Sequence, residues 1–224
     1  MSIHDGHRAR LRQQLKKSGI ESFSDIQALE LLLCYAIPRQ DTNVIAHRLL
    51  ERFRSIDCVF EASVEALCEV QGVGQSAAEL ICLVPELERR HLIGRSAAVR
   101  ILDTTEKCAN YLLPFFHGEQ EEIVYLLCLD AKCKILDCTL VHRGSVNSAN
   151  VSIRSIVKTA LLSNASSVVL AHNHPSGIAL PSEEDRQTTL ALDAALDAVD
   201  IVLADHIIVA EQDYVSLRDD GILR

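Results

Sequence analysis

The stretch SSVVLAHNHPSGIALPSEED (residues 166–185) decides the fold of the second half of the chain, because it joins an apolar run to a helix start through a polar loop. The run SSVVLA predicts a buried strand, and Ser182 can cap the helix that follows. His172 and His174 project from the same face of an extended segment. Asp185 lies one turn into the helix, so its carboxylate can turn back toward the two imidazoles. Either a metal site or an ordinary polar loop would account for this cluster.

If the cluster is a metal site, its residue types indicate which kind of metal site. Two neutral histidine nitrogens and one carboxylate, with a fourth position open, form the ligand set of a catalytic zinc ion rather than a structural one. Such a site suits the carboxyl end of a strand in an α/β protein. Glu183 and Glu184 are interpreted as helix-start carboxylates, which the helix dipole favours. The chain contains neither H-E-x-x-H nor the paired-cysteine motif of the zinc deaminases, which excludes those two zinc chemistries.

The second half of the chain has the pattern of strands mixed with helices. EEIVYLLCLD predicts a buried strand, and KILDCTLVH predicts an antiparallel neighbour. SIRSIVKTALLSN and SEEDRQTTLALDAALDAV predict helices, whereas IVLADHIIVA and YVSL predict closing strands. This order predicts an α/β domain with a mixed sheet over residues 102–224.

The first half of the chain predicts helices alone, in a domain over residues 1–97. IQALELLLCYAI is a buried helix that ends before Pro38, and either Asp41 or Thr42 can cap the next one. SVEALCEVQGVGQSAAELICLVPELERR predicts two helices joined by a tight turn at Gly72-Val73-Gly74. The segment HLIGRSAAVRILDTT (residues 91–105) is the predicted linker between the two domains.

Composition limits the class of protein. Residues 1–100 carry 13 basic and 13 acidic side chains, whereas residues 101–224 carry 9 and 18, which accounts for the net charge of −9. An acidic second half argues against direct contact with nucleic acid, while Arg8 to Lys17 form a local basic arm. The eight cysteines include no C-x-x-C pair, so we expect buried or half-buried free thiols. No apolar run is long enough for a signal or a membrane span, and we expect a cytoplasmic protein.

The spacing His-x-His, seven residues, Ser, two residues, Asp resembles the JAMM signature of the MPN-domain (JAB-type) metalloproteases. AHNHPSG, PSEED and LADHIIV, after a helical domain with an internal GVG, resemble the RadC family over nearly the whole chain. This resemblance implies a cytidine-deaminase-like α/β fold with one Zn²⁺ per chain, held by His172, His174 and Asp185. Asn173 departs from the Ser or Thr of the eukaryotic enzymes, but RadC-type proteins share it.

The resemblance also implies roles for residues outside the ligand set. A glutamate at the start of an early strand is the base, which matches Glu122 best and Glu121 next. Ser182 would hydrogen-bond the oxyanion, although a helix N-cap is the alternative role for its hydroxyl. His206 is either a neighbour that orients a ligand or a core histidine. Ser145 is either a residue of a substrate-binding loop or, as we expect, part of a simple turn.

Two functions follow from these features. In the first, the chain is a zinc-dependent hydrolase that cleaves an amide in a peptide or protein substrate. In the second, it is a DNA repair or recombination accessory protein whose metal site is structural or vestigial. The turn at Gly72, Val73 and Gly74 resembles a helix-hairpin-helix motif, whose backbone N–H groups can receive a DNA phosphate. The sequence identifies neither the substrate nor the oligomeric state.

Overall fold

The computed structural model describes residues 3–96, 101–144, 152–211 and 213–223. The chain divides into two compact units, residues 1–88 and 89–224, which are taken one at a time below. No helix among the described residues is long and apolar enough to cross a membrane.

The first unit is helical, in agreement with the sequence pattern. Its core joins apolar side chains from successive helices, among them Leu29, Leu49 and Ile81, each fully buried. Polar caps start several of these helices: Ser24 forms a capping box with Gln27, and Asp41 rather than Thr42 caps the third helix. The helices are α1 (Ile3–Ser18), the short 3₁₀ turn η1 (Ile20–Ser22), α2 (Asp25–Ala36), α3 (Thr42–Phe53), α4 (Ile56–Glu61), α5 (Val64–Cys68) and α6 (Gln75–Ser96), which continues into the second unit.

The turn between α5 and α6 explains the GVG sequence. Gly72 has φ of 101°, and a Cβ placed there would lie 2.9 Å from the Ile45 side chain, so both conformation and space require glycine. Val73 is buried in the helical core, as predicted. Arg48 Nη1 donates to the carbonyl oxygen of Gln71 at 3.0 Å and closes the turn from α3.

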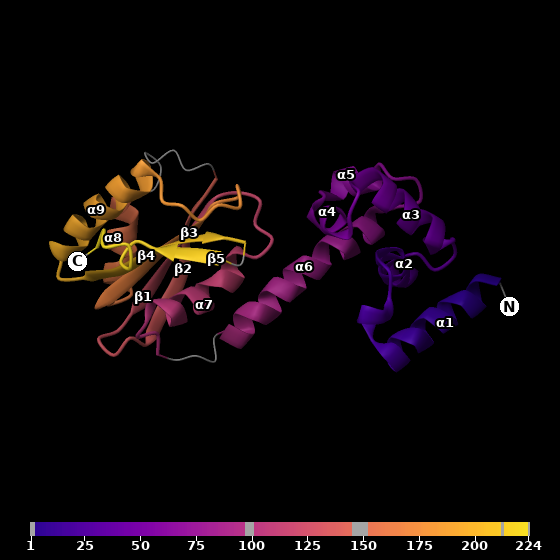
Figure 1. Cartoon of the computed structure of the whole chain (residues 1–224), viewed down its shortest axis with the longest axis horizontal. Coiled ribbons are helices and arrows are strands. Elements are labelled where there is room, and N and C mark those ends of the chain that lie inside the picture. The colour runs from indigo at the N-terminus through magenta and orange to yellow at the C-terminus, as the bar shows by residue number, and fades with distance from the viewer. Residues whose placement is uncertain (1–2, 97–100, 145–151, 212, 224) are drawn as a thin grey trace. The chain divides into compact units, whose positions relative to one another are not determined.

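The second unit is built on a five-stranded mixed sheet in the order β2-β1-β3-β4-β5 (Figure 1). Only the β3–β4 pair is parallel; the other neighbours are antiparallel. This confirms the predicted fold class, including the antiparallel β1–β2 pair. The elements are α7 (Thr105–Phe116), β1 (Ile123–Leu129), β2 (Ile135–Arg143), α8 (Ile153–Leu162), β3 (Ser167–Asn173), α9 (Glu183–Asp197), β4 (Val202–Ala210) and β5 (Asp213–Ser216).

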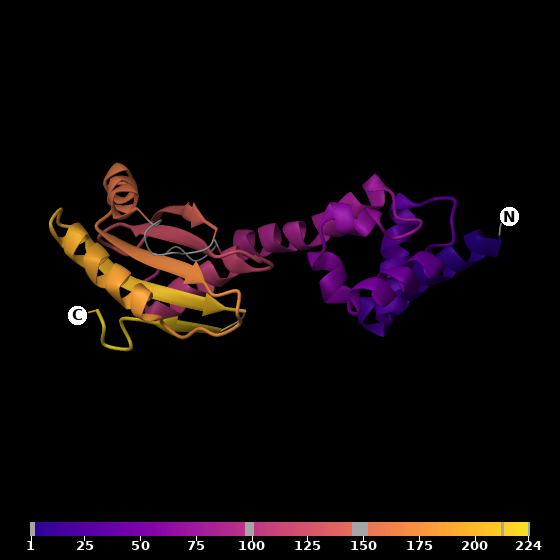
Figure 2. The same cartoon turned by 90° about the horizontal axis from the view of Figure 1, so that it is seen from above.

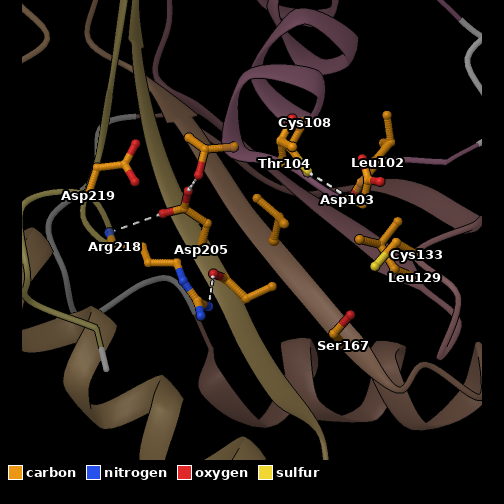
Figure 3. A pocket seen from close by; sticks show the side chains of 13 residues that line it. Leu102, Asp103, Thr104, Cys108, Leu129, Cys133, Ser167, Asp205, Arg218 and Asp219 are labelled. Carbon is orange, nitrogen blue, oxygen red and sulfur yellow. Dashed lines mark hydrogen bonds between the residues drawn. The ribbon is translucent and has the colours of Figure 1, made fainter.

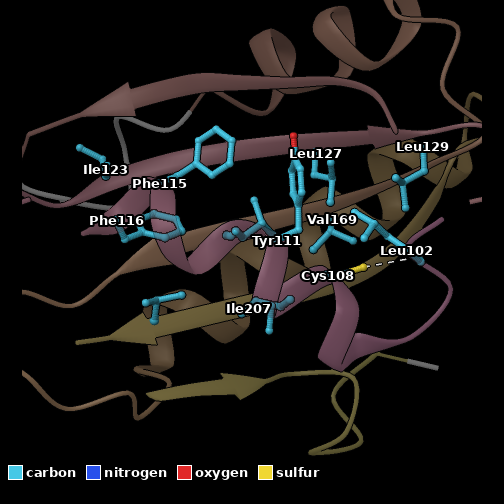
Figure 4. Packing of buried hydrophobic residues seen from close by; sticks show 14 residues of the cluster. Leu102, Cys108, Tyr111, Phe115, Phe116, Ile123, Leu127, Leu129, Val169 and Ile207 are labelled. Atoms are coloured by element: carbon cyan, nitrogen blue, oxygen red, sulfur yellow. Dashed lines mark hydrogen bonds between the residues drawn. The ribbon is translucent and has the colours of Figure 1, made fainter. Parts of the chain in front are cut away.

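Helices cover both faces of this sheet. On one face α7 inserts Tyr111, Phe115 and Phe116 against β1, β3 and β4 (Figure 4). On the other face α8 and α9 pack on the alternate side chains, and α9 runs along the strands (Figure 2). Both faces of β1 and β3 are therefore buried, which explains why their sequences are continuously apolar rather than alternating.

Three features of the described chain differ from expectation. Helix α7 falls where no helix was predicted, although Cys108, Leu112 and Phe115 recur with helical spacing. Residues 91–96 of the expected linker are the last turns of α6, and residues 97–100 lie outside the described part of the chain. Among the eight free cysteines Cys58 is exposed, whereas the others are buried or half-buried.

Candidate metal centre

The candidate metal centre lies at the carboxyl end of β3. Side chains alternate along this strand, so His172 shares the face of Val168 and Leu170, which is covered by α8 and α9. The backbone N–H of His174 donates to the carbonyl oxygen of Val209 at 2.8 Å and extends the parallel pairing beyond the strand. The next turns return the chain to α9, whose first turn carries Asp185.

Three ligand atoms converge at this point. His172 Nε2 lies 3.0 Å from His174 Nε2 and 3.2 Å from Asp185 Oδ1. His174 Nε2 lies 3.6 Å from Asp185 Oδ2. The structure thus brings together the three residues proposed as ligands, and they form a group that could hold a metal ion.

The spacing of these atoms fits a tetrahedral ion. Ligand atoms about 2.0–2.1 Å from such an ion lie about 3.3 Å apart, close to the three separations above. His174 Nδ1 is 3.0 Å from the carbonyl oxygen of Ile178, which can only accept, so this nitrogen carries the proton. The Nε2 lone pair of His174 is then directed at the other two ligands. The residues present therefore fit a divalent metal ion.

Electrostatics within the cluster favour a cation between the ligands. Burial raises the pKa of Asp185, but the contacts of its carboxylate with the His172 and His174 rings outweigh burial and hold that pKa well below its usual value. The contact with the Asp185 carboxylate raises the pKa of His174 in turn. Both shifts express the attraction of one buried carboxylate for positive charge.

Ser182 is the N-cap of α9. Its hydroxyl accepts from the Asp185 backbone N–H at 3.1 Å and donates to Asp185 Oδ2 at 2.5 Å, while its own N–H donates to the same oxygen at 2.8 Å. This is a capping box in which the carboxylate of a candidate metal ligand takes part. The hydroxyl proton is directed at Asp185; the oxyanion role expected for Ser182 stays a prediction.

Glu122 lies just before β1, next to the metal centre. By alternation it shares a face with Val124, which pairs with His172 in the sheet. The contact with Asp185 is the main cause of the raised pKa of His174, and the charge of Glu122 adds to it, so the two side chains act on each other electrostatically. Glu121 lies in the bend before β1, its side chain is 62% exposed, and its Oε2 lies 3.9 Å from Arg143 Nη1.

Asn173 holds the backbone around Glu122. Its Oδ1 accepts from the N–H of Ile123 at 2.8 Å, and its Nδ2 donates to the carbonyl oxygen of Glu121 at 3.0 Å. The amide is 4% exposed and takes the place of a main-chain rung where the β1–β3 ladder ends. The middle residue of HNH therefore connects the ligand loop to the strand that carries Glu122, a role that the sequence pattern does not reveal.

His206 of β4 lies behind the ligands. It is 2% exposed, and its Nε2 is 2.9 Å from His172 Nδ1. Burial lowers its pKa well below the usual value, so the ring is neutral. Of the two roles expected for His206, the contact with His172 favours the neighbour that orients a ligand. Thr189, also buried at this site, has no counterpart among the predicted residues.

A second hollow in this unit is separate from the metal centre. It has a volume of about 370 Å³ and is lined by residues of α7, β3, β4 and the C-terminal segment (Figure 3). Its buried carboxylate, Asp205, accepts hydrogen bonds from Thr105 and Ser216 hydroxyls at 3.1 and 2.7 Å and from the Arg218 N–H at 3.2 Å. Asp205 thus ties α7 and the chain after β5 to β4, which is a structural role.

The remaining predicted site residues lie elsewhere in the chain. Gly72, Val73 and Gly74 form the turn before α6, in the first unit. Ser145 lies outside the described residues.

Comparison with known proteins agrees with both units. Residues 102–222 match the family model described as the RadC-like JAB domain, and residues 42–84 match the SAM-like helix-hairpin-helix tandem. A UPF0758 protein of Pseudoalteromonas translucida is 34% identical, with 96% of each chain covered. UPF0758 proteins of Pseudomonas fluorescens and Fusobacterium nucleatum are 34% and 32% identical, with 99% and 98% of each chain covered. The similarity therefore extends over both units.

Proposed function

Because the chain belongs to the RadC family, we propose that it is a zinc-dependent hydrolase of the JAMM type that cleaves a peptide or isopeptide amide. The convergence of His172 Nε2, His174 Nε2 and the two Asp185 carboxylate oxygens at separations of 3.0–3.6 Å carries this proposal. Three protein ligands leave the fourth position of a tetrahedral ion for water or substrate, which is the arrangement of a catalytic site.

Each residue has a definite task in this proposal. Zn²⁺ bound by the three ligands would polarise the substrate carbonyl and lower the pKa of a water molecule to about 7. Glu122 accepts a proton from the attacking water and returns it to the leaving amine. Its place on the face of Val124 and His172, and its electrostatic effect on His174, support Glu122 over the exposed Glu121 as the base.

Metal analysis is the first test of this proposal. We expect purified protein to contain about one zinc ion per chain and His174→Ala to lose it, because a ligand is removed. Retention of zinc by His174→Ala would contradict the ligand assignment.

The second test addresses catalysis, with quenched-fluorescence peptides and isopeptide-linked conjugates as substrates. We expect Glu122→Gln to keep its zinc but to reduce turnover by about 10²- to 10⁴-fold, the range for loss of a general base. Glu121→Gln is the matched control and is expected to remain active. Full activity of Glu122→Gln on any substrate that wild type cleaves would refute the mechanism.

A second function, sequence-independent DNA binding, is favoured by the helix-hairpin-helix match over residues 42–84. Gly74 precedes the first residue of α6, a position where backbone N–H groups can hold a phosphate. A Cβ at Gly74 would meet open space, so a side chain can be added without a clash. In this alternative the chain is an accessory protein for DNA repair or recombination, and its metal site is structural or vestigial.

Substitution of Gly74 tests this second function. We expect Gly74→Asp to abolish binding of a labelled DNA duplex, because the carboxylate caps the helix and repels phosphate. Gly74→Ser is a neutral cap and is expected to retain binding. Fluorescence anisotropy at several salt concentrations provides the measurement. Equal affinity of the two variants, or no salt dependence, would argue against phosphate contact at this turn.

A further inference from the structure

A chain of buried polar groups runs behind the metal centre from α9 to β3. Thr189 Oγ1 lies 2.5 Å from the carbonyl oxygen of Asp185, one turn earlier in α9, and 2.6 Å from His206 Nδ1. His206 Nε2 lies 2.9 Å from His172 Nδ1. Thr189, His206 and His172 are 0%, 2% and 3% exposed, so these contacts are shielded from solvent.

The hydrogen-bonding capacity of each group fixes the direction of this chain. A backbone carbonyl only accepts, so the single hydroxyl proton of Thr189 goes to Asp185. The Thr189 oxygen must then accept from His206 Nδ1–H. In a neutral ring with its proton on Nδ1, Nε2 is an acceptor, so His206 Nε2 accepts from His172 Nδ1–H. The remaining ring nitrogen of His172, Nε2, is left with its lone pair.

We propose that Thr189 and His206 are positioning residues that fix His172 as the Nδ1–H tautomer and so direct its Nε2 lone pair at the metal. The series of hydrogen bonds begins at the backbone of one candidate ligand, Asp185, and ends at the imidazole of another, His172. A metal held by both side chains would connect the two ends of this series, which passes through α9, β4 and β3. The inference rests on the metal site of the proposed function and is independent of hydrolysis.

The opposite tautomer would block the site. A proton on His172 Nε2 would point toward His174 Nε2 at 3.0 Å and Asp185 Oδ1 at 3.2 Å, where a metal ion is to sit. Without the hydroxyl of Thr189, a proton on His206 Nδ1 loses its acceptor in this series of hydrogen bonds. The proton then favours His206 Nε2, which would donate to His172 Nδ1 and leave the His172 proton on Nε2. Thr189 therefore influences a ligand that it does not touch.

The tautomer can be read directly from metal-free wild-type protein labelled with ¹⁵N, in which no bound ion occupies His172 Nε2. We expect the proton between the rings to be bonded to His172 Nδ1, with a scalar coupling through the hydrogen bond to His206 Nε2. A proton bonded to His206 Nε2 would overturn the proposal, whatever the behaviour of any variant.

Variants test the effect on the metal, with Zn²⁺ affinity measured by competition with a chelator. We expect Thr189→Val, similar in shape but without a hydroxyl, to weaken zinc binding about 10- to 100-fold, as loss of an orienting partner does. Thr189→Ser should restore nearly wild-type affinity. Thr159→Val is the matched control, because Thr159 donates the same hydrogen bond one turn back, to the Ser155 carbonyl oxygen at 3.0 Å, in α8, which contributes none of the three candidate ligands.

The outcomes separate this inference from the proposed function. Wild-type affinity in Thr189→Val would overturn the positioning role. An equal loss of zinc affinity in Thr159→Val would overturn it too, because removal of a threonine hydroxyl from any helix of this unit would then have the same effect. Failure of wild type to bind zinc would overturn both this inference and the proposed function. Zinc binding that depends on Thr189 in a protein without hydrolytic activity would support the inference and count against the proposed function alone.

Discussion

At the scale of single residues, Asp185 has two tasks that compete for the same carboxylate. Oδ2 accepts from the N–H and the hydroxyl of Ser182, and both oxygens face the two histidines. The sequence predicted that Asp185 would lie close to His172 and His174, because the spacing of the three candidate ligands can be read directly from the sequence. The sharing with Ser182 depends on the geometry of a helix start, which permits a cap and a ligand at the same position.

Substitution of Ser182 separates the two roles open to its hydroxyl. We expect Ser182→Ala to lower the free energy of unfolding by about 1 kcal/mol, because the cap of α9 is lost. Ser182→Asn should recover most of that stability, since asparagine is a good N-cap. Urea unfolding supplies the measurement, and Ser182→Thr is the control that keeps both cap and hydroxyl.

Catalysis by these variants then decides the oxyanion role. If the hydroxyl serves only as a cap, Ser182→Asn should be nearly as active as wild type on any substrate found. A loss of about 10²-fold or more in a stable Ser182→Asn protein would show that the hydroxyl stabilises the oxyanion.

At the scale of elements, the pairing of β1 with β3 decides where Glu122, the proposed base, lies. The ladder between these strands ends at the pair of Val124 and His172, and the side chain of Asn173 continues it with two hydrogen bonds to backbone. Buried strands are readily predicted from their apolar runs. A side chain that replaces a main-chain hydrogen bond between two strands cannot be predicted in this way, because the same asparagine is equally common in turns.

Removal of this amide is expected to be costly. Asn173→Ala leaves the N–H of Ile123 and the carbonyl of Glu121 without their partner, and we expect the free energy of unfolding of the second unit to fall by about 2–3 kcal/mol. Tyrosine fluorescence during urea unfolding, measured in a Tyr35→Phe background that removes the tyrosine of the first unit, reports on the second unit, which contains Tyr111, Tyr125 and Tyr214. Asn110→Ala, at an exposed site on α7, is the control and should change stability by less than about 0.5 kcal/mol. Similar values for the two variants would show that the amide is dispensable.

Helix α7 marks the limit of prediction from sequence at this scale. The periodicity of its apolar positions is present, but it follows the segment interpreted as a linker, and Pro114 interrupts the helical propensity. The role of its apolar face can be recognised only in the folded unit, where that face covers the sheet. Thr189 and His206 meet for a similar reason: 17 residues separate them in sequence, and only the packing of α9 on β4 joins them.

At the scale of the whole molecule, the uneven charge is the feature that sequence and structure describe together. The 9 basic and 18 acidic side chains of residues 101–224 fall in the unit that carries the metal centre, whereas the hairpin turn lies in the half with no net charge. Negative charge on the unit that carries the candidate metal centre favours capture of a cation and disfavours a polyanion. The two proposed functions therefore belong to different parts of the chain, and each can be impaired by substitutions that leave the other unchanged.

The proximity of His174 and Asp185 has a further consequence for chain entropy. An ion held by both residues would be a reversible cross-link across the ten residues between them, and in the unfolded chain such a link costs loop-closure entropy. The loop contains Gly177, at φ of 78°, and the exposed apolar side chains of Ile178 and Leu180, so its own packing is sparse. Metal supply would then set how often this loop opens, and with it the rate at which a protease could cut there.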